Sequence, residues 1–374
     1  MKPIYLDTNA SSPPIIQAKT ALINSINNIG NPSSPHCLGR LQKTRLDSAR
    51  LIIAKSLDTN EKNIVFTSGA SEANRFLVES ILSISKKNNQ KLNVVTTPFE
   101  HPSLEKPLTH AAKLNQIKLA ILKLKNEKII LDNKLLYKAD VVFATQAHNE
   151  TGIIIDWTNI IKNCKKNTIL ICDASQGFSK ITLITSRIDA IVISGHKIGA
   201  FPGIGALMLS NNAKQFNAKW LGGGQERGLR PGTEALGLIE AFAAASKIIE
   251  IQRKQYQNIS KLRDMMENNL LKIWPNSKIL GKKEARLPNT TAFLINNMNG
   301  EALRIAIDTQ KICVGFGSAC SGLSPEPSPA LIAMNLTPKQ VKSTIRISLH
   351  PKTTKQEILD AIMRLKKIKI KTIK

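Results

Sequence analysis

The sequence predicts an α/β protein with a mainly parallel sheet and a second, smaller α+β domain. Over residues 60–210, short apolar runs rich in β-branched residues alternate with longer amphipathic runs. The short runs are almost continuously apolar, which is typical of parallel strands that helices cover on both faces. After about residue 235 this alternation gives way to long helical patterns with few strands. We therefore expect a large domain over residues 15–255 and a small domain formed by residues 1–14 and 256–374.

Each expected element follows from the spacing of its apolar residues. Helical spacing predicts helices over residues 39–57 and 72–85. The strands predicted around them cover residues 63–67, 93–97, 141–145, 168–174, 190–195 and 205–210. The elements predicted in the small domain are a long helix over 235–259, strands at 290–295 and 343–349, and a final helix at 355–367. Ligands of such open sheets bind beyond the carboxyl ends of the strands, where the polar motifs of this chain fall.

The composition excludes several classes of protein. The chain has 374 residues, 42% of them hydrophobic, which is enough for a large core and a smaller second one. No apolar run approaches the roughly 18–20 residues of a membrane helix, and the first residues lack a signal-peptide pattern, so we expect a soluble cytoplasmic protein. The five cysteines show no C-x-x-C spacing, which disfavours a zinc site or a disulfide framework.

The formal net charge of +26 has two interpretations. It could attract nucleic acid or another acidic partner. It could also reflect compositional bias, since Lys, Ile and Asn are all abundant. We favour the bias, because the basic residues form few stripes and aromatic residues, which stack on bases, make up only 4% of the chain. The basic tail at residues 364–374 is interpreted as a solvated helix end, with a docking surface for an acidic partner as the alternative.

Two polar residues follow or end apolar strands in a way that suggests cofactor chemistry. Lys197 stands in "SGHK" directly after the predicted strand 190–195. It is either a solvated lysine or a Schiff-base amine held at the mouth of the sheet. Asp173 ends "ILICD" and either caps a turn or pairs with a protonated pyridine nitrogen. The second interpretation of each residue is what an enzyme that uses pyridoxal 5′-phosphate (PLP) needs.

A third motif could bind the phosphate group of such a cofactor. In "FTSGASEAN" a predicted strand runs through Ser-Gly-Ala-Ser into a helix that Glu72 opens. Ser68 or Ser71 could simply cap this helix, or the helix N-terminus could bind a phosphate. Together, Ser71, Asp173 and Lys197 would supply an anion site, a pyridinium partner and a Schiff-base amine.

The sequence resembles the cysteine desulfurases of the NifS/IscS type, which belong to the class V aminotransferases of PLP fold type I. The motifs that carry the resemblance are, in the family's order, "YLDTNASSP", "GNPSSPHCLGR", "FTSGASEAN", "EHPS", "HNETG", "DASQ", "SGHK", "GGGQERGLRPGTE", "GSACS" and "STIRISL". They cover nearly the whole chain. The resemblance implies a PLP-dependent transferase with a mainly parallel seven-stranded sheet in its large domain, acting as an obligate homodimer.

The resemblance also implies roles for individual residues. Lys197 would hold PLP covalently, Asp173 would pair with its ring nitrogen, and Gln176 would bond the ring hydroxyl. His101 would stack on the ring and assist proton transfer. The phosphate ligands would be Ala70, Ser71, Ser194, His196 and, from the second subunit, Thr233. The residues that hold the substrate carboxylate would be Asn149, also counted with the cofactor site, and Arg346. Without the resemblance, His101 could be a loop histidine, Asn149 a turn residue and Arg346 a strand-edge surface charge.

Cys320, in "GFGSACSG", is the remaining residue to which the resemblance assigns chemistry. Its thiolate would take sulfur from L-cysteine as a persulfide, leaving L-alanine, and pass it to an acceptor protein. That acceptor could belong to iron–sulfur cluster assembly, a tRNA-thiolation relay or a nitrogenase-type pathway. The flanking glycines predict a mobile segment over residues 315–325.

Two alternatives stay open at this point. One is a selenocysteine lyase or another class V PLP aminotransferase or lyase on the same fold. The other is a basic nucleic-acid-binding protein, which would leave Lys197, Asp173 and the phosphate motif unexplained. The chain also departs from the family pattern, with Ala200, Phe201 and Pro202 where Gly-Pro-Lys is usual, and with a short C-terminus that puts scaffold docking in doubt.

Overall fold

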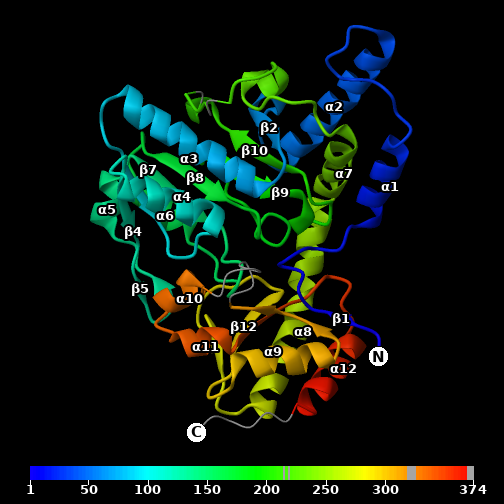
Figure 1. The fold of residues 1–374 in the computed structure, drawn as a ribbon, viewed down its shortest axis with the longest axis vertical. Coiled ribbons are helices and arrows are strands. Elements are labelled where there is room, and N and C mark those ends of the chain that lie inside the picture. The colour runs from blue at the N-terminus through cyan, green and yellow to red at the C-terminus, as the bar shows by residue number, and fades with distance from the viewer. Residues whose placement is uncertain (214, 218–219, 318–325, 369–374) are drawn as a thin grey trace.

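The protein is described by a computed structural model that covers residues 1–213, 215–217, 220–317 and 326–368. Figure 1 shows a large upper part built around a sheet and a smaller lower part that contains both ends of the chain. The helix α8 (Ile249–Ile273) runs from one part into the other. It therefore spans the boundary expected near residue 255, and the division into two domains stays a prediction.

The large sheet has seven strands in the order β2-β10-β9-β8-β7-β3-β4. Their bounds are β2 Ile64–Thr67, β10 Gly205–Leu209, β9 Ala190–Ser194, β8 Ile169–Asp173, β7 Val141–Thr145, β3 Asn93–Thr96 and β4 Lys118–Ile121. Only β10 runs antiparallel to its neighbours. The predicted mainly parallel, seven-stranded sheet is therefore confirmed. The edge strand β4 was not predicted, because its half-exposed residues lack the continuous apolar pattern of the interior strands.

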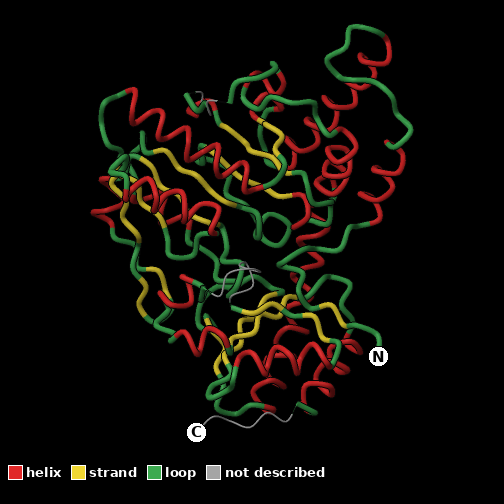
Figure 2. The backbone as a smooth tube through the Cα atoms, in the orientation of Figure 1, coloured by secondary structure: helices red, strands yellow, loops and turns green. Residues whose placement is uncertain are grey.

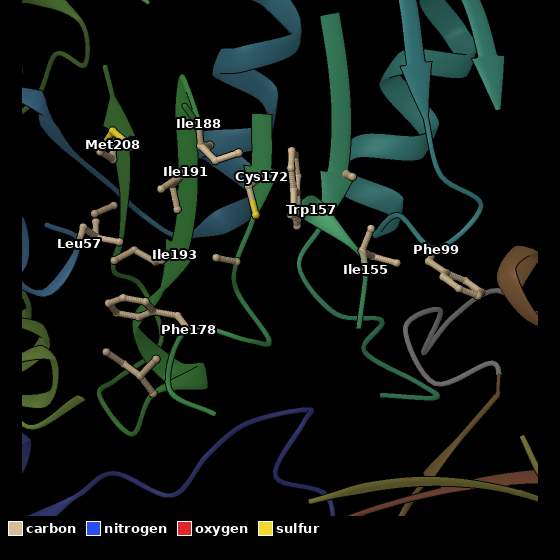
Figure 3. Close-up of a cluster of buried hydrophobic side chains, with 14 of the residues drawn as sticks. Leu57, Phe99, Ile155, Trp157, Cys172, Phe178, Ile188, Ile191, Ile193 and Met208 are labelled. Atoms are coloured by element: carbon tan, nitrogen blue, oxygen red, sulfur yellow. The ribbon is translucent and has the colours of Figure 1, made fainter. Parts of the chain in front are cut away.

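Helices cover both faces of this sheet because its strand residues alternate between two buried clusters. On one face, α3 (Ala70–Lys87) and α4 (Pro102–Lys113) pack on Val141 and Phe143. On the other, α2 (Cys37–Ser56), α6 (Trp157–Asn163) and α7 (Leu236–Lys247) pack on Val142 and Ala144. Figure 3 shows part of this second cluster, with Cys172 pointing from its strand into the core. Cys172 is thus a buried strand residue, whereas Cys37 is exposed.

The predicted helix over 235–259 is two helices. The backbone of Ile248 adopts φ −107° and ψ 23°, outside the helical region, so α7 ends before it and α8 begins after it. The helix α1 (Ile16–Ser25) packs against α7. The remaining short elements of the large part are η1 Glu61–Asn63, β5 Leu124–Lys125, β6 Lys128–Ile129, α5 Asn133–Lys138, η2 Gly195–Lys197, η3 Asn211–Ala213 and η4 Gln225–Gly228.

The small part is an antiparallel sheet covered by helices on its outer face. Its strand order is β11-β12-β15-β14. The bounds are β11 Lys278–Leu280, β12 Thr290–Leu294, β15 Thr344–Ser348 and β14 Gly315–Phe316. In Figure 2 these strands lie between the large sheet and the helices α9 (Gly300–Thr309) and α12 (Lys355–Lys366). The sheet thus presents one face to the large part of the molecule.

The chain start belongs to the small part, since β1 (Ile4–Tyr5) pairs in parallel with β13 (Ile312–Cys313). The short helices α10 (Pro329–Ala333) and α11 (Pro338–Lys342) precede β15. Gly315 and Phe316 form β14 and pair with β15, so these two residues are strand and not the start of a loop as expected. Among the described residues, no helix is long and apolar enough to cross a membrane.

Candidate active site

A cavity of about 500 Å³ lies where strands of the large sheet end and the small sheet begins. The carboxyl ends of β2, β3, β7, β8 and β9 meet at one edge, because these strands all point the same way. The predicted site residues that line the cavity are Ala70, Ser71, His101, Asn149, Asp173, Gln176, Ser194, His196, Lys197 and Arg346. Two others are not part of it: Thr233 is exposed elsewhere, and Cys320 lies outside the described residues.

Lys197 enters the cavity from η2, the single turn that follows β9. Its Nζ donates hydrogen bonds to the backbone oxygens of Asn9, at 2.6 Å, and Ala10, at 2.9 Å. The N-terminal segment thus positions the amine. Burial together with the positive charge of Lys197 lowers the pKa of the neighbouring His196 to about 4. His196 is therefore neutral near pH 7 and can offer a ring nitrogen to a ligand without bringing a charge.

Asp173, at the end of β8, is 6% exposed and has both carboxylate oxygens engaged. Oδ1 accepts a hydrogen bond from the backbone N–H of Ser175, and Oδ2 accepts one from Nδ2 of Asn74, each at 2.9 Å. The turn-capping contact that the sequence allowed is therefore present. It leaves the carboxylate on the cavity wall, where its remaining lone pairs can accept a proton donor such as a pyridinium nitrogen.

The anion end of the cavity is the start of α3. The N-cap is Gly69, with φ 153° and ψ −180°, a conformation accessible essentially only to glycine. No side chain caps this helix, so Ser68 and Ser71 do not play the ordinary capping role that was the alternative. A Cβ placed on Gly69 would meet no atom within 4 Å. The first N–H groups of α3 have no partner inside the helix, and Ala70 and Ser71 line the cavity, which suits a phosphate.

His101 is held at one nitrogen by a short hydrogen-bond chain. Its Nδ1 accepts from the backbone N–H of Ser103 at 3.1 Å and contacts the Ser103 hydroxyl at 2.8 Å. That hydroxyl accepts from Nδ2 of Asn74 at 3.0 Å, which leaves its own hydrogen for His101. Burial lowers the pKa of His101, the charge of Asp173 opposes this, and Lys197 adds to it. A neutral His101 therefore carries its hydrogen on Nε2.

Arg346 is buried at 5% exposure on the interior strand β15, so the alternative of a strand-edge surface charge is wrong. Its Nη2 pairs with Asp7 at 2.7 Å, and its Nη1 donates to the backbone oxygen of Asn149 at 3.3 Å. Its Nε is buried without a hydrogen-bond partner. Gly315 lies directly against the guanidinium, since a Cβ there would come within 2.7 Å of Nη2. An ordered guanidinium with an unused donor is ready to bind a carboxylate.

The sequence reasoning missed several residues that hold the site together. Asn74 ties Asp173 to Ser103, and Asp7 orients Arg346. Asn9 is fully buried, and its Nδ2 donates to Thr290 Oγ1 at 2.9 Å and to the Asn149 oxygen at 3.1 Å. One signal was available for Asn74, because it interrupts the apolar face of an amphipathic helix.

The residues present fit PLP. The cavity volume lies within the range of small-molecule sites. The open hollow in front of Gly69 can take the phosphate, and Asp173 can meet the ring nitrogen. The Arg346 guanidinium, which also lines the cavity, can bind a further anionic group. In the described part of the chain, no group of three or more His, Cys, Asp or Glu side chains could hold a metal ion.

Comparisons with known proteins agree with the geometry. The family model described as Aminotransferase class-V matches residues 4–360. Cysteine desulfurase 2 of Trichormus variabilis is 32% identical over 373 residues, covering 98% of this chain and 92% of that protein. Cysteine desulfurase IscS of Rickettsia typhi is 31% identical over 369 residues, covering 95% and 88%. A solved NifS-like protein from Rickettsia africae has a TM-score of 0.84 and 29% identity, covering 97% of this chain and 98% of that one.

Proposed function

The chain belongs to the class V aminotransferase family and is a PLP-dependent enzyme of the cysteine desulfurase type, and we propose that it converts L-cysteine to L-alanine while Cys320 accepts the sulfur as a persulfide. One observation carries the proposal. A single cavity joins the Lys197 amine, the Asp173 carboxylate, the open N-terminus of α3 and the guanidinium side chain of Arg346. Few ligands other than PLP with an amino acid need all four.

When bound, PLP supplies an electron sink for the pair left behind as the substrate Cα loses its proton. Asp173 would keep the ring nitrogen protonated, and Asn74 and Ser175 hold the Asp173 carboxylate in place. Lys197 Nζ would hold the cofactor covalently and would take the proton from the substrate Cα. The backbone oxygens of Asn9 and Ala10 accept hydrogen bonds from this amine and hold it at the cavity wall. The α3 N-terminus, Ser71, Ser194 and His196 bind the phosphate.

Arg346 and Asn149 bind the substrate carboxylate. The guanidinium is fixed by Asp7 and by the Asn149 backbone before substrate arrives, so little is lost in ordering it on binding. His101 lies on the cavity wall with its hydrogen on Nε2. It is proposed to stack on the cofactor ring and to assist proton transfer during the reaction.

The role of Cys320 rests on the resemblance and on the described residues that flank it. The backbone N–H of Ser328 donates to the oxygen of Gly317 at 3.1 Å, and Gly317 donates to Thr344 at 3.1 Å. Both anchors lie beside β15, the strand that carries Arg346. Cys320 stands between these anchors in the sequence; its thiolate would accept the substrate sulfur, and the resulting persulfide would pass that sulfur to the acceptor.

We propose further that two chains form a homodimer. The exposed apolar side chains Ile26, Ile29, Leu38 and Leu41 gather where the segment after α1 meets the start of α2. Figure 1 shows these elements at the outer edge of the large part. Such a patch is typical of a protein–protein interface. Thr233, exposed and away from its own cavity, would then reach the phosphate of the partner subunit.

The sulfur acceptor is proposed to be a cytoplasmic protein of iron–sulfur cluster assembly or of a relay for thio-cofactors or tRNA thiolation. The four described cysteines are all free, which suits a reducing compartment. Nucleic acid is not proposed as a direct partner, since the charge is interpreted as compositional bias.

The test is sulfide release from L-cysteine by the purified full chain loaded with PLP, with dithiothreitol as the final acceptor. We expect equal amounts of sulfide and alanine from the wild type. Cys320→Ala should bind PLP and L-cysteine normally, seen as the same absorbance changes, but release no sulfide. Lys197→Ala should lose the borohydride-stable attachment of PLP. A colourless protein that PLP cannot reconstitute would contradict the proposal, and activity on L-selenocysteine alone would favour a selenocysteine lyase.

A further inference from the structure

Lys180, just beyond β8, is completely buried close to the cavity without lining it. Its Nζ donates to two oxygens of the same residue, the backbone oxygen and Oε1 of Gln176, each at 2.9 Å. Its ammonium also lies 5.7 Å from the centre of the Tyr256 ring. Burial lowers the pKa of Lys180 well below its usual value, and the charges of Lys197 and Arg346 lower it further.

A buried lysine at this position lowers the stability of the folded protein. Burying an ammonium group costs free energy that two hydrogen bonds to neutral oxygens offset only in part. An apolar side chain of similar length would pack there without that cost. Packing alone therefore does not explain why a lysine occupies position 180. Its contact with Gln176 indicates another role.

Gln176 is held by two partners that leave its amide only one orientation. Lys180 Nζ donates to Oε1, so the carbonyl end of the amide faces Lys180. Nε2 donates to the backbone oxygen of Asn9 at 2.8 Å, which can only accept. Asn9 is also the residue whose backbone oxygen accepts from Lys197. An amide nitrogen carries two hydrogens, so the second N–H of Gln176, a cavity-lining residue, remains for a ligand.

We propose that Lys180 is a positioning residue, which locks the Gln176 amide so that an N–H, and not the carbonyl oxygen, faces the ring oxygen of bound PLP. The inference rests on the proposed function, in which PLP occupies this cavity with its ring oxygen at Gln176. Lys180 itself touches neither PLP nor substrate. It acts through Gln176 alone.

This orientation has a consequence for the proton on the Lys197 nitrogen in the PLP-loaded protein. That proton is stabilised by the negative charge of the neighbouring ring oxygen. A hydrogen bond from Gln176 draws part of this charge away, so it lowers the pH at which the proton leaves. The other titratable groups on the cavity wall are Asp7, Glu72, His101, Asp173, His196 and Arg346, and none of them is replaced in the Lys180 variant.

The experiment is a pH titration of the visible absorbance of the PLP-loaded protein, without substrate. Lys180→Met keeps an unbranched side chain one atom shorter and removes the donor. We expect its absorbance midpoint to move to higher pH by about one unit, a tenfold change in the proton equilibrium. Gln176→Met should move the midpoint in the same direction. In the double variant, Lys180→Met should add nothing to the shift that Gln176→Met already causes.

A matched control is Arg253→Met. Arg253 is another buried base of this region, and its Nε donates to the backbone oxygen of Phe178, two residues before Lys180. It does not line the cavity, so its loss should leave the midpoint unchanged. The melting temperature of each variant is measured alongside.

The outcomes separate the two claims. A wild type that does not bind PLP would end the proposed function itself. A wild type that binds PLP, with a Lys180→Met midpoint equal to its own, would overturn only the inference. So would an equal shift with and without Gln176, because Lys180 would then act directly on Lys197. An unfolded Lys180→Met protein would also overturn it, because Lys180 would then be a requirement of the fold.

Discussion

Asn74 donates a hydrogen bond to Asp173 at 2.9 Å, which ties the helix at the anion end of the cavity to the carboxylate at the end of β8. The same amide nitrogen donates to Ser103, which in turn contacts His101. One buried side chain thus sets the positions of the proposed ring-nitrogen partner and of the proposed proton donor. The positions of Asp173 and His101 therefore depend on this shared contact as well as on the elements that carry them.

Replacing Asn74 should therefore damage the site more than the fold. Asn74→Leu removes both hydrogen bonds and leaves the Asp173 carboxylate less well held. A hydrogen bond to a charged group is worth about 1.5–3 kcal/mol, so we expect PLP affinity to fall roughly 10- to 100-fold. Ser80→Ala is the control, since Ser80 is a fully buried residue of the same helix that bonds only Phe76. Equal PLP affinities in the two variants, measured by absorbance titration, would contradict this role.

Arg346→Lys should affect substrate binding and not cofactor binding. Lysine cannot bond Asp7, the Asn149 backbone and a carboxylate with one ammonium group as a planar guanidinium can. We expect KM for L-cysteine to rise roughly 10- to 100-fold, the loss of one charge-assisted hydrogen bond, with PLP affinity within about twofold of the wild type. Steady-state kinetics and PLP titration separate the two. Weaker PLP binding at unchanged KM would place Arg346 in the cofactor site.

Glu100 gives the stability of the protein a specific pH dependence. Burial raises its pKa to about 8, although hydrogen bonds from Thr97 and the Thr145 backbone oppose this. In the unfolded chain a glutamate titrates near 4.3, so between about pH 5 and pH 8 the folded state binds the extra proton. By linkage, the contribution of Glu100 to stability falls as pH rises through this range.

Glu100→Gln imitates the protonated carboxyl and cannot ionise. We expect the melting temperature of the variant minus that of the wild type to increase as the pH is raised from about 5 to about 8. Glu105→Gln, on the half-exposed side of α4, is the control and should show a constant difference. A difference for Glu100→Gln that is the same at both pH values would mean that Glu100 is ionised in the folded protein throughout.

Charges placed on the exposed apolar patch should dissociate the proposed homodimer. Ile29→Glu combined with Leu41→Glu puts two carboxylates where side chains that are 77% and 52% exposed in the single chain would be buried against a second copy. We expect a monomer by light scattering, with weaker PLP binding because Thr233 of the partner no longer reaches the cavity. Ile305→Glu, on the exposed side of α9 in the small part, should leave the assembly unchanged. A monomeric wild type would contradict the proposal directly.

The sequence by itself determined six of the seven strands of the large sheet and the placement of Lys197 and Asp173 at strand ends. These are local properties, because a buried parallel strand needs a continuous apolar run and its polar end residue follows directly. The local apolar pattern failed to predict elements whose form depends on what they pack against. It missed the half-exposed edge strand β4 and the break between α7 and α8. The resemblance to a family supplied the roles of Arg346, His101 and Asn149, for which the sequence pattern alone left ordinary structural roles open.

Only the tertiary structure decided how these residues are held. Asp7 reaches Arg346, Asn9 reaches Gln176 and Lys197, and Asn74 reaches Asp173, each across a long stretch of sequence. Lys180 is separated from Gln176 by a single turn, but the sequence does not say that it is buried or that Asn9 closes the other side of the amide. Such contacts produce no repeating pattern in the sequence from which they could be predicted. They exist because two separate sheets meet at one edge and enclose polar groups, and each of those groups must find a partner once water is excluded.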